Sequence, residues 1–520
     1  MALYILPRPS SARLRAVIAL VAGAAVTASF APLSLWPLAV LGPAVLMWLW
    51  QDAPPRESGW LGFIFNAGTF SAGTYWLLLS LPLGGAPIWL ALLLMLGLTG
   101  LMALYHAGLG FACARWLPRA GWLRTLVALP AAWLLVEWWR GWFLSGFSWL
   151  SLGYSQTDTW LAGLAPVAGV YGVSAALLLC AGALVTLLSG TKWARVSAVA
   201  VLVVPWAAGA TLRGVSWTHP SGAPVSVAIA QGAVPQDEKW LDANREATLD
   251  LYAKLTEQAY GNALIVWPES APADTANDLV PWLTHIYRDA HAHGSALVMG
   301  ILRAEGGVSD SDPVRYYNSV LALDEKVSWY DKHHLVPFAE FFPVPQFVRK
   351  WMRLMSLPYS DFTPGAAYQP PLEAARLRLG ATVCYEDAYG SLMLEELRRG
   401  GADALVNVTN DAWFDHSNAR HLHFQVARMR ALEEGRYLIR ATNDGISAII
   451  GPRGEVVARA PEFRPVVLVS NVTPLAGLTP YAHVGNLPLV ALAALALACG
   501  IGVRNDRLWR TRSGSASAVA

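Results

Sequence analysis

The first 212 residues consist of long apolar stretches separated by short polar breaks, and this pattern predicts helices that span a membrane. A helix needs roughly 20 mostly apolar residues to cross a bilayer. Seven stretches before residue 212 and one near the C-terminus approach this length: 14–31, 36–50, 59–80, 86–112, 122–139, 161–189, 194–211 and 486–503. The second stretch is short and contains Pro43, so it fits a spanning helix least well. We therefore predict a polytopic α-helical membrane domain with about eight transmembrane helices.

From residue 222 the pattern changes to short apolar runs of four to eight residues, separated by turns. Such runs are typical of β-strands. They occur in PVSVAIAQG, NALIVWPES, SALVMGILR, YYNSVLALD, RLGATVCYED, ADALVNVTND and RATNDGISAIIGPRG–EVVARA. Helical stretches at 238–259 and 419–436 lie between them, with Trp240 at the apparent start of the first. Strands that alternate with helices favour an α/β layered fold.

Composition and charge support a division at the same places. The chain is 55% hydrophobic and 14% charged, whereas soluble domains carry about 25% charged residues. The charged residues concentrate in the middle of the chain. We therefore expect a membrane domain over 1–212, a water-exposed domain over 213–485, and an eighth helix with a tail over 486–520. A net charge of +2 without a basic stripe argues against a nucleic-acid partner.

Arginine and lysine residues near the ends of the predicted spans indicate the orientation of the chain, because cytoplasmic loops carry an excess of both. One side carries 13 of them, and the short loops of the other side carry Arg140 alone. We expect both termini to be cytoplasmic and 213–485 to lie on the opposite face. The first stretch also has small residues suited to signal-peptide cleavage at 25–31, but further spans follow it directly.

The segment 137–160 is rich in Trp and Phe at the outer end of a predicted span. One interpretation is an aromatic belt at the level of the lipid headgroups. The other is that Glu137 and Arg140, one helical turn apart, hold a headgroup.

One cysteine stands apart from the other three. Cys113, Cys180 and Cys499 fall in predicted spans, where a small apolar thiol is ordinary packing. Cys384 is the one cysteine of 213–485, so it has no partner there for a structural disulfide. It ends a predicted strand in GATVCYEDAYG, where a side chain can face a pocket. Cys384 is therefore a candidate nucleophile, with buried filler as the alternative.

Two further segments supply groups that a cysteine nucleophile needs. Glu269 follows a buried strand and a proline in IVWPES, and Lys332 lies in WYDKHHLVPFAE with Glu340 eight residues on. A carboxylate in a partly dry pocket can take the thiol proton. A nearby lysine can lower the thiol pKa and stabilise an oxyanion. An ion pair without catalytic work is the alternative for Glu269 and Lys332.

Together and in this order, these motifs resemble the Glu–Lys–Cys triad of the nitrilase superfamily. With apolar spans before and after them, nearly the whole chain resembles the apolipoprotein N-acyltransferase family of the bacterial inner membrane. Further motifs carry the resemblance: QGAVPQDEKW, NDAWF, HFQVARMRALE, IRATNDGISAIIGPRG and TPYAHVGN. The implied fold of the outer domain is an α-β-β-α sandwich.

The resemblance implies roles for particular residues. Glu269 is the expected general base, Lys332 the transition-state stabiliser and Cys384 the nucleophile. The residues expected to support them or to bind substrate are Trp240, Glu340, Tyr385 and Glu386. No cofactor or metal is expected, since the histidines at 333, 334, 416, 421 and 423 match no zinc-site spacing.

Two positions depart from the family pattern. Asp415 follows NDAWF where a glycine is expected, and Asp444 stands in ATNDG where a second Asn is usual. Neither belongs to the triad, but both could alter loops near it.

The implied reaction is acyl transfer in two steps. A phospholipid, with phosphatidylethanolamine expected, acylates Cys384, and the thioester then acylates the N-terminal α-amine of a diacylglyceryl-cysteine apolipoprotein. The catalytic domain would lie on the periplasmic face of the inner membrane. Two alternatives remain open: a membrane-anchored nitrilase-type amidase or hydrolase, and a non-enzymatic membrane protein with an inactive nitrilase domain.

Overall fold

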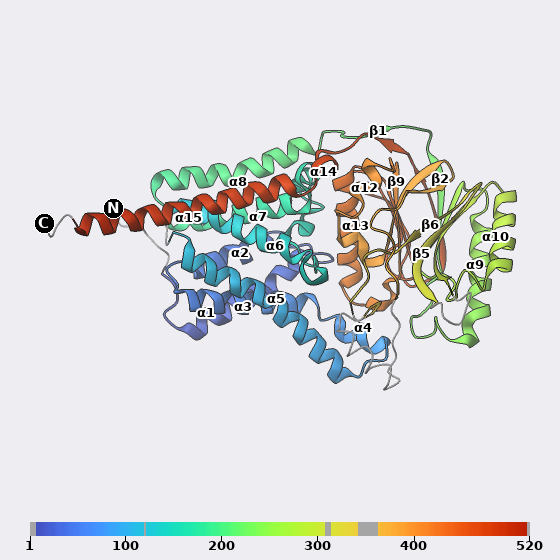
Figure 1. Cartoon of the computed structure of the whole chain (residues 1–520), viewed down its shortest axis with the longest axis horizontal. Helices are drawn as coiled ribbons and strands as arrows, with labels where there is room; N and C mark the ends of the chain where they lie inside the picture. The colour runs from blue at the N-terminus through green and yellow to red at the C-terminus, as the bar shows by residue number, and fades with distance from the viewer. Residues whose placement is uncertain (1–6, 119–120, 307–313, 338, 342–361, 517–520) are drawn as a thin grey trace. The chain divides into compact units, whose positions relative to one another are not determined.

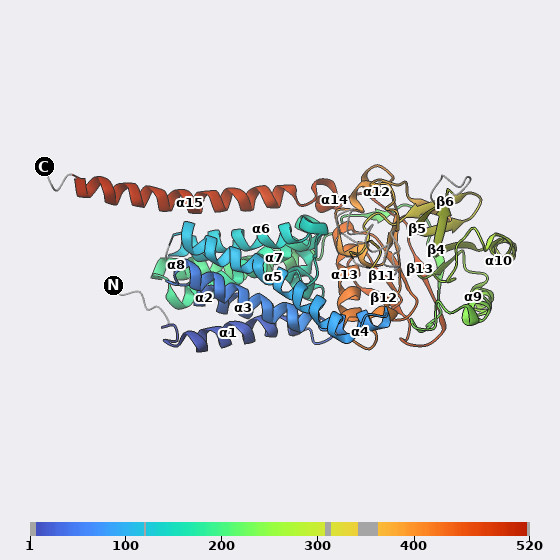
Figure 2. The same cartoon turned by 60° about the horizontal axis from the view of Figure 1, so that its bottom comes forward.

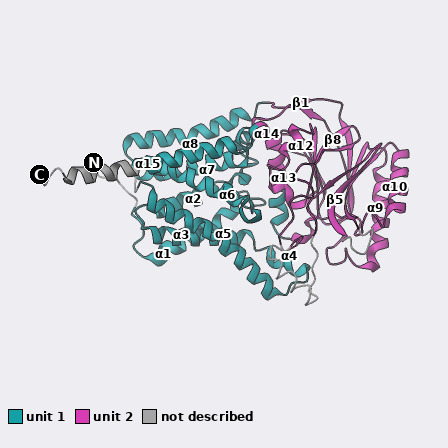
Figure 3. Cartoon of the chain, viewed as in Figure 1, with its two compact units in different colours: residues 1–215, 417–425, 484–520 teal, residues 216–416, 426–483 magenta. Residues whose placement is uncertain are grey.

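The chain forms two compact units, which Figure 3 shows in different colours. The computed structural model describes residues 7–118, 121–306, 314–337, 339–341 and 362–516, the last part (504–516) by its backbone alone. The first unit comprises 1–215, 417–425 and 484–520, and the second comprises 216–416 and 426–483. The segment 417–425 therefore groups with the N-terminal helices although it lies within the expected outer domain.

The first unit is helical, and its long helices run alongside one another in both views (Figures 1 and 2). A π-helical turn, Arg124–Ala128, leads directly into α6. Short 3₁₀ turns follow α1 and fill the connection between α6 and α7. The helices are α1 (Ala12–Val26), α2 (Leu38–Leu49), α3 (Pro55–Gly73), α4 (Leu77–Leu83), α5 (Ile88–Trp116), α6 (Leu129–Arg140), α7 (Ala165–Ser189), α8 (Lys192–Leu212) and α15 (Leu487–Ala516).

A helix covers most of each predicted apolar stretch, so the helical character of this region is confirmed. Within the described residues, four helical segments are long and apolar enough to cross a membrane: Ala12–Ser29, Ile88–Trp116, Trp160–Ser189 and Lys192–Leu212. Leu38–Leu49 and Leu487–Val503 are shorter apolar helices. The count of eight spans remains a prediction.

Glu137 and Arg140 are buried in the first unit, where both form hydrogen bonds with other residues of that unit. Arg140 donates to the carbonyl oxygens of Phe147 and Trp149, each at 2.7 Å. Glu137 accepts from the Ser174 hydroxyl. These contacts hold the aromatic connection between α6 and α7 in place, and they occupy the groups that the headgroup interpretation assigned to lipid.

The second unit contains two six-stranded sheets that share one design. Each has three parallel strands at its centre and antiparallel strands at its edges, in the orders β13-β2-β3-β4-β5-β6 and β12-β11-β10-β9-β8-β7. A two-stranded ribbon joins β1 to β14. The strands are β1 (His219–Pro220), β2 (Val225–Gln231), β3 (Leu264–Trp267), β4 (Ala296–Glu305), β5 (Arg315–Leu323), β6 (Val327–Asp331), β7 (Leu372–Ala374), β8 (Leu377–Val383), β9 (Ala404–Thr409), β10 (Leu438–Thr442), β11 (Ala448–Ile450), β12 (Val456–Arg459), β13 (Val466–Val472) and β14 (Leu475–Ala476).

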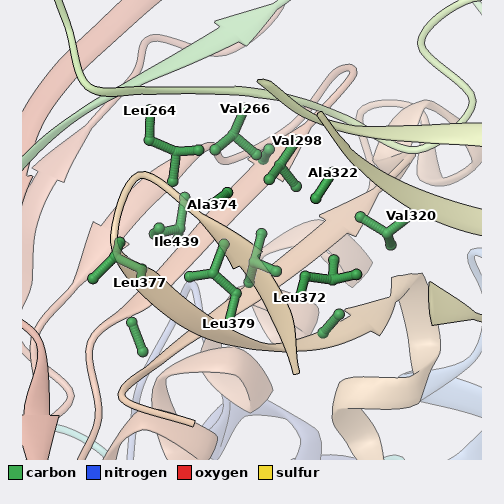
Figure 4. Close-up of a cluster of buried hydrophobic side chains, with 14 of the residues drawn as sticks. Leu264, Val266, Val298, Val320, Ala322, Leu372, Ala374, Leu377, Leu379 and Ile439 are labelled. Atoms are coloured by element: carbon green, nitrogen blue, oxygen red, sulfur yellow. The ribbon is translucent and has the colours of Figure 1, made fainter. Parts of the chain in front are cut away.

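Successive side chains of a strand point to opposite faces of its sheet, so each sheet packs against the other sheet on one face and against helices on the other. In β2, Val227 and Ile229 belong to a core shared by both sheets, whereas Ala228 and Ala230 pack with helical residues. Figure 4 shows the core between the sheets, where Val298 and Ile439 come from different sheets. Period-two alternation with both faces buried is typical of a sheet covered on each side.

Helices cover the outer faces of the two sheets. α9 (Arg245–Ala259) and α10 (Val280–Ala292) pack on the first sheet, since residues such as Tyr252 and Ile286 share a buried cluster with it. Figure 1 shows α12 (Leu394–Arg398) and the second-unit part of α13 (Ala419–Glu434) on the other side. A short helix, α14 (Pro480–Val484), follows β14. The predicted α-β-β-α sandwich is confirmed.

One predicted element is wrong in its start. The helix expected over 238–259 begins at Arg245, after a 3₁₀ turn at Asp242–Asn244. Trp240 therefore lies in the turn that precedes the helix and not at the start of the helix. Hydrogen bonds of Gln236 and Lys239 hold this turn out of the helix.

Candidate active site

Glu269 is separated from β3 by Pro268 alone, and the backbone around it is tightly packed. Its side chain is buried, and the next residue, Ser270, has a φ of +45°. A Cβ atom on Gly300 of the neighbouring strand β4 would lie 2.5 Å from the Glu269 Cα. Only glycine leaves room for this approach. The close contact fixes where the carboxylate leaves the sheet.

Lys332 lies directly after β6 and is buried. Its backbone N–H donates to the carbonyl oxygen of Asn318 on β5, at 2.8 Å. Its Nζ donates to Oε1 of Glu340 at 2.8 Å. Glu340 is itself fixed, since its Oε2 accepts from the backbone N–H of Val336 at 2.8 Å. The predicted neighbours Lys332 and Glu340 therefore form an ion pair.

Asn318 connects this pair to Glu269. Its Nδ2 donates to Oε1 of Glu269 at 2.8 Å and to Oε1 of Glu340 at 3.0 Å. Glu269, Asn318, Glu340 and Lys332 thus form one continuous set of hydrogen bonds. The sequence did not single out Asn318. The one indication in the sequence was its position in the YYNSV strand, which precedes the strand that leads to Lys332.

Cys384 directly follows β8 and is the first residue of the 3₁₀ helix Cys384–Ala388. Its φ is +53°, a left-handed conformation that non-glycine residues rarely adopt. Strained backbone of this kind persists only where the surroundings hold it. Here the Nδ2 of Asn407 on β9 donates to the Cys384 carbonyl oxygen at 3.2 Å.

Glu386 holds the Cys384 turn to the Lys332 loop. It is fully buried, and its Oε2 accepts from the Val383 N–H at 2.8 Å and from the Tyr330 hydroxyl at 3.1 Å. Its Oε1 accepts from the N–H groups of His333 and His334 at 2.8 and 2.9 Å. One buried carboxylate therefore binds both loops, while the supporting role of Glu386 in catalysis stays a prediction.

A buried ion cluster lies behind the Cys384 turn. Arg440 on β10 donates to Asp387 and Asp411 at 3.1 and 3.0 Å, and to Oδ1 of Asn407 at 2.7 Å. All three charged side chains are fully buried. Arg440 lies in the IRATNDG motif, but sequence reasoning assigned it no role.

The electrostatics keep the thiol protonated and the lysine charged. Burial and the Glu269 charge raise the pKa of the Cys384 thiol, against the lowering effects of Lys332 and Thr409. Burial alone would lower the pKa of Lys332, but Glu340, Glu269, Cys384 and Glu386 raise it by more. The charges of Glu269 and Lys332 therefore act on the Cys384 thiol in opposite directions.

The two remaining predicted residues, Tyr385 and Trp240, form none of the hydrogen bonds described above. Tyr385, the residue after Cys384, packs edge-on against Tyr389, with ring centroids 5.2 Å apart. Trp240 is 48% exposed. Among the described residues, no hydrogen bond or ring contact joins Trp240 to Glu269, Lys332 or Cys384. Its neighbour Lys239, which the sequence analysis passed over, is buried and contacts Glu269.

Comparison with known proteins covers both units. The profile of the apolipoprotein N-acyltransferase N-terminal domain matches residues 22–183, and that of carbon-nitrogen hydrolases matches 226–481. The apolipoprotein N-acyltransferase of Methylococcus capsulatus is 41% identical over 492 residues, which is 92% of this chain and 94% of that protein. The enzyme of the same name from Azotobacter vinelandii is also 41% identical, over 92% of this chain and 93% of that protein. This chain belongs to the apolipoprotein N-acyltransferase family.

Solved structures resemble about half of this chain, and only distantly. A carbon-nitrogen hydrolase from Helicobacter pylori is 17% identical with a TM-score of 0.36, over 48% of this chain and 89% of that one. Membership of the apolipoprotein N-acyltransferase family and the long apolar helices make this chain a bacterial membrane protein.

The two departures from the family pattern differ in how they affect the local backbone. Asp415 has a φ of +47° and a ψ of −146°, a region almost reserved for glycine, so the expected glycine has a physical reason. Asp444 uses its Oδ1 to accept from the N–H groups of Gly445 and Phe463 at 2.9 and 3.1 Å. An asparagine offers the same oxygen, so this departure preserves the turn.

Metal-ligating residues do not gather in the described part of the chain. No group of three or more His, Cys, Asp or Glu side chains there is arranged to hold a metal ion. The buried acids near Cys384 instead accept hydrogen bonds from the backbone, asparagine and arginine.

Proposed function

We propose that this protein transfers an acyl chain from a phospholipid to the N-terminal α-amine of diacylglyceryl-cysteine in apolipoproteins, through a thioester on Cys384. One observation carries the proposal. In a chain of this family, Glu269, Asn318, Glu340 and Lys332 share one set of hydrogen bonds, and the charges of Glu269 and Lys332 act on the Cys384 thiol.

In the first step, the Cys384 sulfur attacks the ester carbonyl carbon of the phospholipid. Because burial keeps the thiol protonated, a base must remove its proton during the attack. Glu269 is the proposed base, since its charge affects the pKa of the thiol more than the charge of Asp411 does. The Lys332 ammonium stabilises the oxyanion that forms. The C–O bond then breaks, Glu269 returns the proton to the departing oxygen, and a lysophospholipid leaves.

In the second step, the α-amine of the lipoprotein attacks the thioester carbonyl carbon. Glu269 accepts a proton from the amine, the C–S bond breaks, and the proton returns to the Cys384 sulfur. The products are an amide and the free thiol, so the enzyme returns to its starting state. Trp240, Glu340, Tyr385 and Glu386 support these steps in the proposal, Glu340 and Glu386 through the hydrogen bonds described above.

The proposal includes a location and a donor. Residues 1–212 and 486–520 form the part in the inner membrane, with both termini cytoplasmic, and 213–485 lies on the periplasmic face. The 13-to-1 distribution of Arg and Lys around the predicted spans supports this orientation. Phosphatidylethanolamine is the proposed acyl donor. An alkaline-phosphatase fusion to the C-terminus should be inactive, and an active fusion would contradict the orientation.

The chemical test uses the full-length protein in detergent with phosphatidylethanolamine. Intact-mass measurement should show one acyl adduct, which Cys384→Ala abolishes and Cys499→Ala retains. Adding a diacylated lipopeptide should remove the adduct and give the N-acylated peptide. Release of free fatty acid without peptide acylation would instead support a hydrolase. A wild-type protein that forms no adduct would overturn the thioester mechanism.

A further inference from the structure

Lys239 is a buried lysine whose ammonium faces the main chain of the proposed base. Its side chain is 1% exposed. Its Nζ donates to the backbone carbonyl oxygen of Glu269 at 3.0 Å. Burying a lysine is costly unless its charge is compensated. None of the roles derived above uses this residue.

The segment that carries Lys239 is fixed on its other side to loops of the second sheet. The Nδ2 of Asn410, which follows β9, donates to Oε1 of Gln236 at 2.6 Å. The Nδ2 of Asn443, which follows β10, donates to the carbonyl oxygen of Val234 at 2.8 Å. The segment 234–239 therefore connects the loops of the nucleophile sheet to the loop of Glu269.

The position of Lys239 gives it two effects on Glu269. The hydrogen bond to the carbonyl oxygen holds the strained turn that begins at Ser270, whose φ is positive. The positive charge also favours the ionised form of a carboxylate close by. Both effects favour the state in which Glu269 can accept the thiol proton.

We propose that Lys239 is a positioning residue of the acylation step, which holds the Glu269 main chain through its hydrogen bond and stabilises the Glu269 carboxylate through its charge. The inference rests on the proposed function, since it assigns Lys239 to the base of that reaction. It makes the QDEKW motif a connection between the two sheets of the site.

The charge state of Lys239 supports the proposal. Burial lowers its pKa to about 8, against the raising effect of Glu269. The ammonium form therefore predominates at neutral pH. Among the described residues, Glu269 is the charged group that acts on Lys239.

The test measures single-turnover acyl-adduct formation on Cys384 from pH 5 to 9 in full-length protein. Lys239→Met should slow adduct formation about 10- to 100-fold at pH 7. It should also move the acidic limb of the profile to higher pH, because the base loses a neighbouring positive charge. Lys254→Met is the matched control, since Lys254 is exposed on α9, and should match the wild type.

A second variant separates the hydrogen bond from the charge. Lys239→Gln keeps a donor for the Glu269 carbonyl oxygen but carries no charge, so it should recover part of the rate and keep the shifted acidic limb. It also decides the question if Lys239→Met does not fold. Folded Lys239 variants whose rate and acidic limb match Lys254→Met would overturn the inference. A wild type without any adduct would overturn the proposed function instead, so the two failures are distinguishable.

Discussion

The two sheets of the second unit share a topology but hold their reactive groups in different ways. On the first sheet, Glu269 and Lys332 are joined through side chains, by way of Asn318 and Glu340. On the second sheet, Cys384 is held through its backbone. Asn407 binds its carbonyl oxygen, and Glu386 binds the N–H of the residue before it.

The difference follows from what each side must provide. A base and an oxyanion stabiliser work through their charges, so hydrogen bonds between side chains can set both position and ionisation. A nucleophile works through the direction of one atom, so its backbone must be fixed in an unfavourable conformation, here a φ of +53°. Stability should therefore depend most on the second sheet, and the pH profile most on the first.

The strongest test of this comparison is Arg440→Met. The variant leaves Asp387 and Asp411 buried without their cation, and removing one partner from a buried ion cluster costs about 3–5 kcal/mol. The melting temperature should fall sharply and the Cys384 adduct should be lost. Arg399→Met breaks the exposed pair with Glu395 and should cost no more than about 1 kcal/mol. Equal melting temperatures for both variants would refute the assignment.

Asn318→Leu tests the first sheet. The variant removes the donor shared by Glu269 and Glu340, and hydrogen bonds to charged groups contribute about 1.5–3 kcal/mol. Adduct formation should therefore slow about 10- to 100-fold, with a shifted acidic limb and a smaller loss of stability than in Arg440→Met. Asn471→Leu, at an exposed position of β13, is the control. An unchanged pH profile in a folded Asn318→Leu protein would contradict the comparison.

Glu434 provides a pH-dependent test at the end of α13. It is fully buried, and neither carboxylate oxygen has a hydrogen-bond partner among the described residues. Burial raises its pKa from 4.5 to about 8, against the effects of Arg430 and Arg436. The folded state thus holds this proton more tightly than the unfolded state, so stability should fall as the pH rises from about 4.5 to about 8.

Glu434→Gln should remove that part of the fall. Its melting temperature should match the wild type near pH 4 and exceed it at pH 9, as thermal unfolding in detergent can measure. Glu395→Gln, a partly exposed position next to an arginine pair, should not gain stability at pH 9. A Glu434→Gln protein that is less stable than wild type at pH 9 would show that the carboxylate is compensated.

The smallest expected effect is a gain of stability in Asp415→Gly. Glycine adopts the observed backbone angles of Asp415 without strain, and relief of such strain contributes about 1 kcal/mol or more. The melting temperature should rise by a few degrees, with adduct formation unchanged. Asp444→Asn should change neither, because both side chains offer the accepting oxygen. A destabilised Asp415→Gly protein would mean that the aspartate side chain contributes more than the strain costs.

Much of the architecture could be predicted from the order of apolar and polar residues. Stretches long enough to cross a bilayer and period-two strands are local patterns, and each carries its own evidence. Boundaries were less certain. α9 begins at Arg245 rather than at 238, because the segment before it is fixed to Glu269 and to the loops of the second sheet. Such distant contacts leave no local periodicity.

The sequence by itself determined the helical and α/β halves, the candidate nucleophile and its charged neighbours, since these depend on composition, strand ends and recognisable motifs. Only the tertiary structure decided which side chains hold them. Asn318 reaches Glu269 because β5 lies two strands from β3, across β4. Lys239 and Arg440 acquired their places from loops and strands far away in the chain. Hydrogen bonds depend on distances of a few ångströms, and those distances are set by the register of the sheets and not by any one segment.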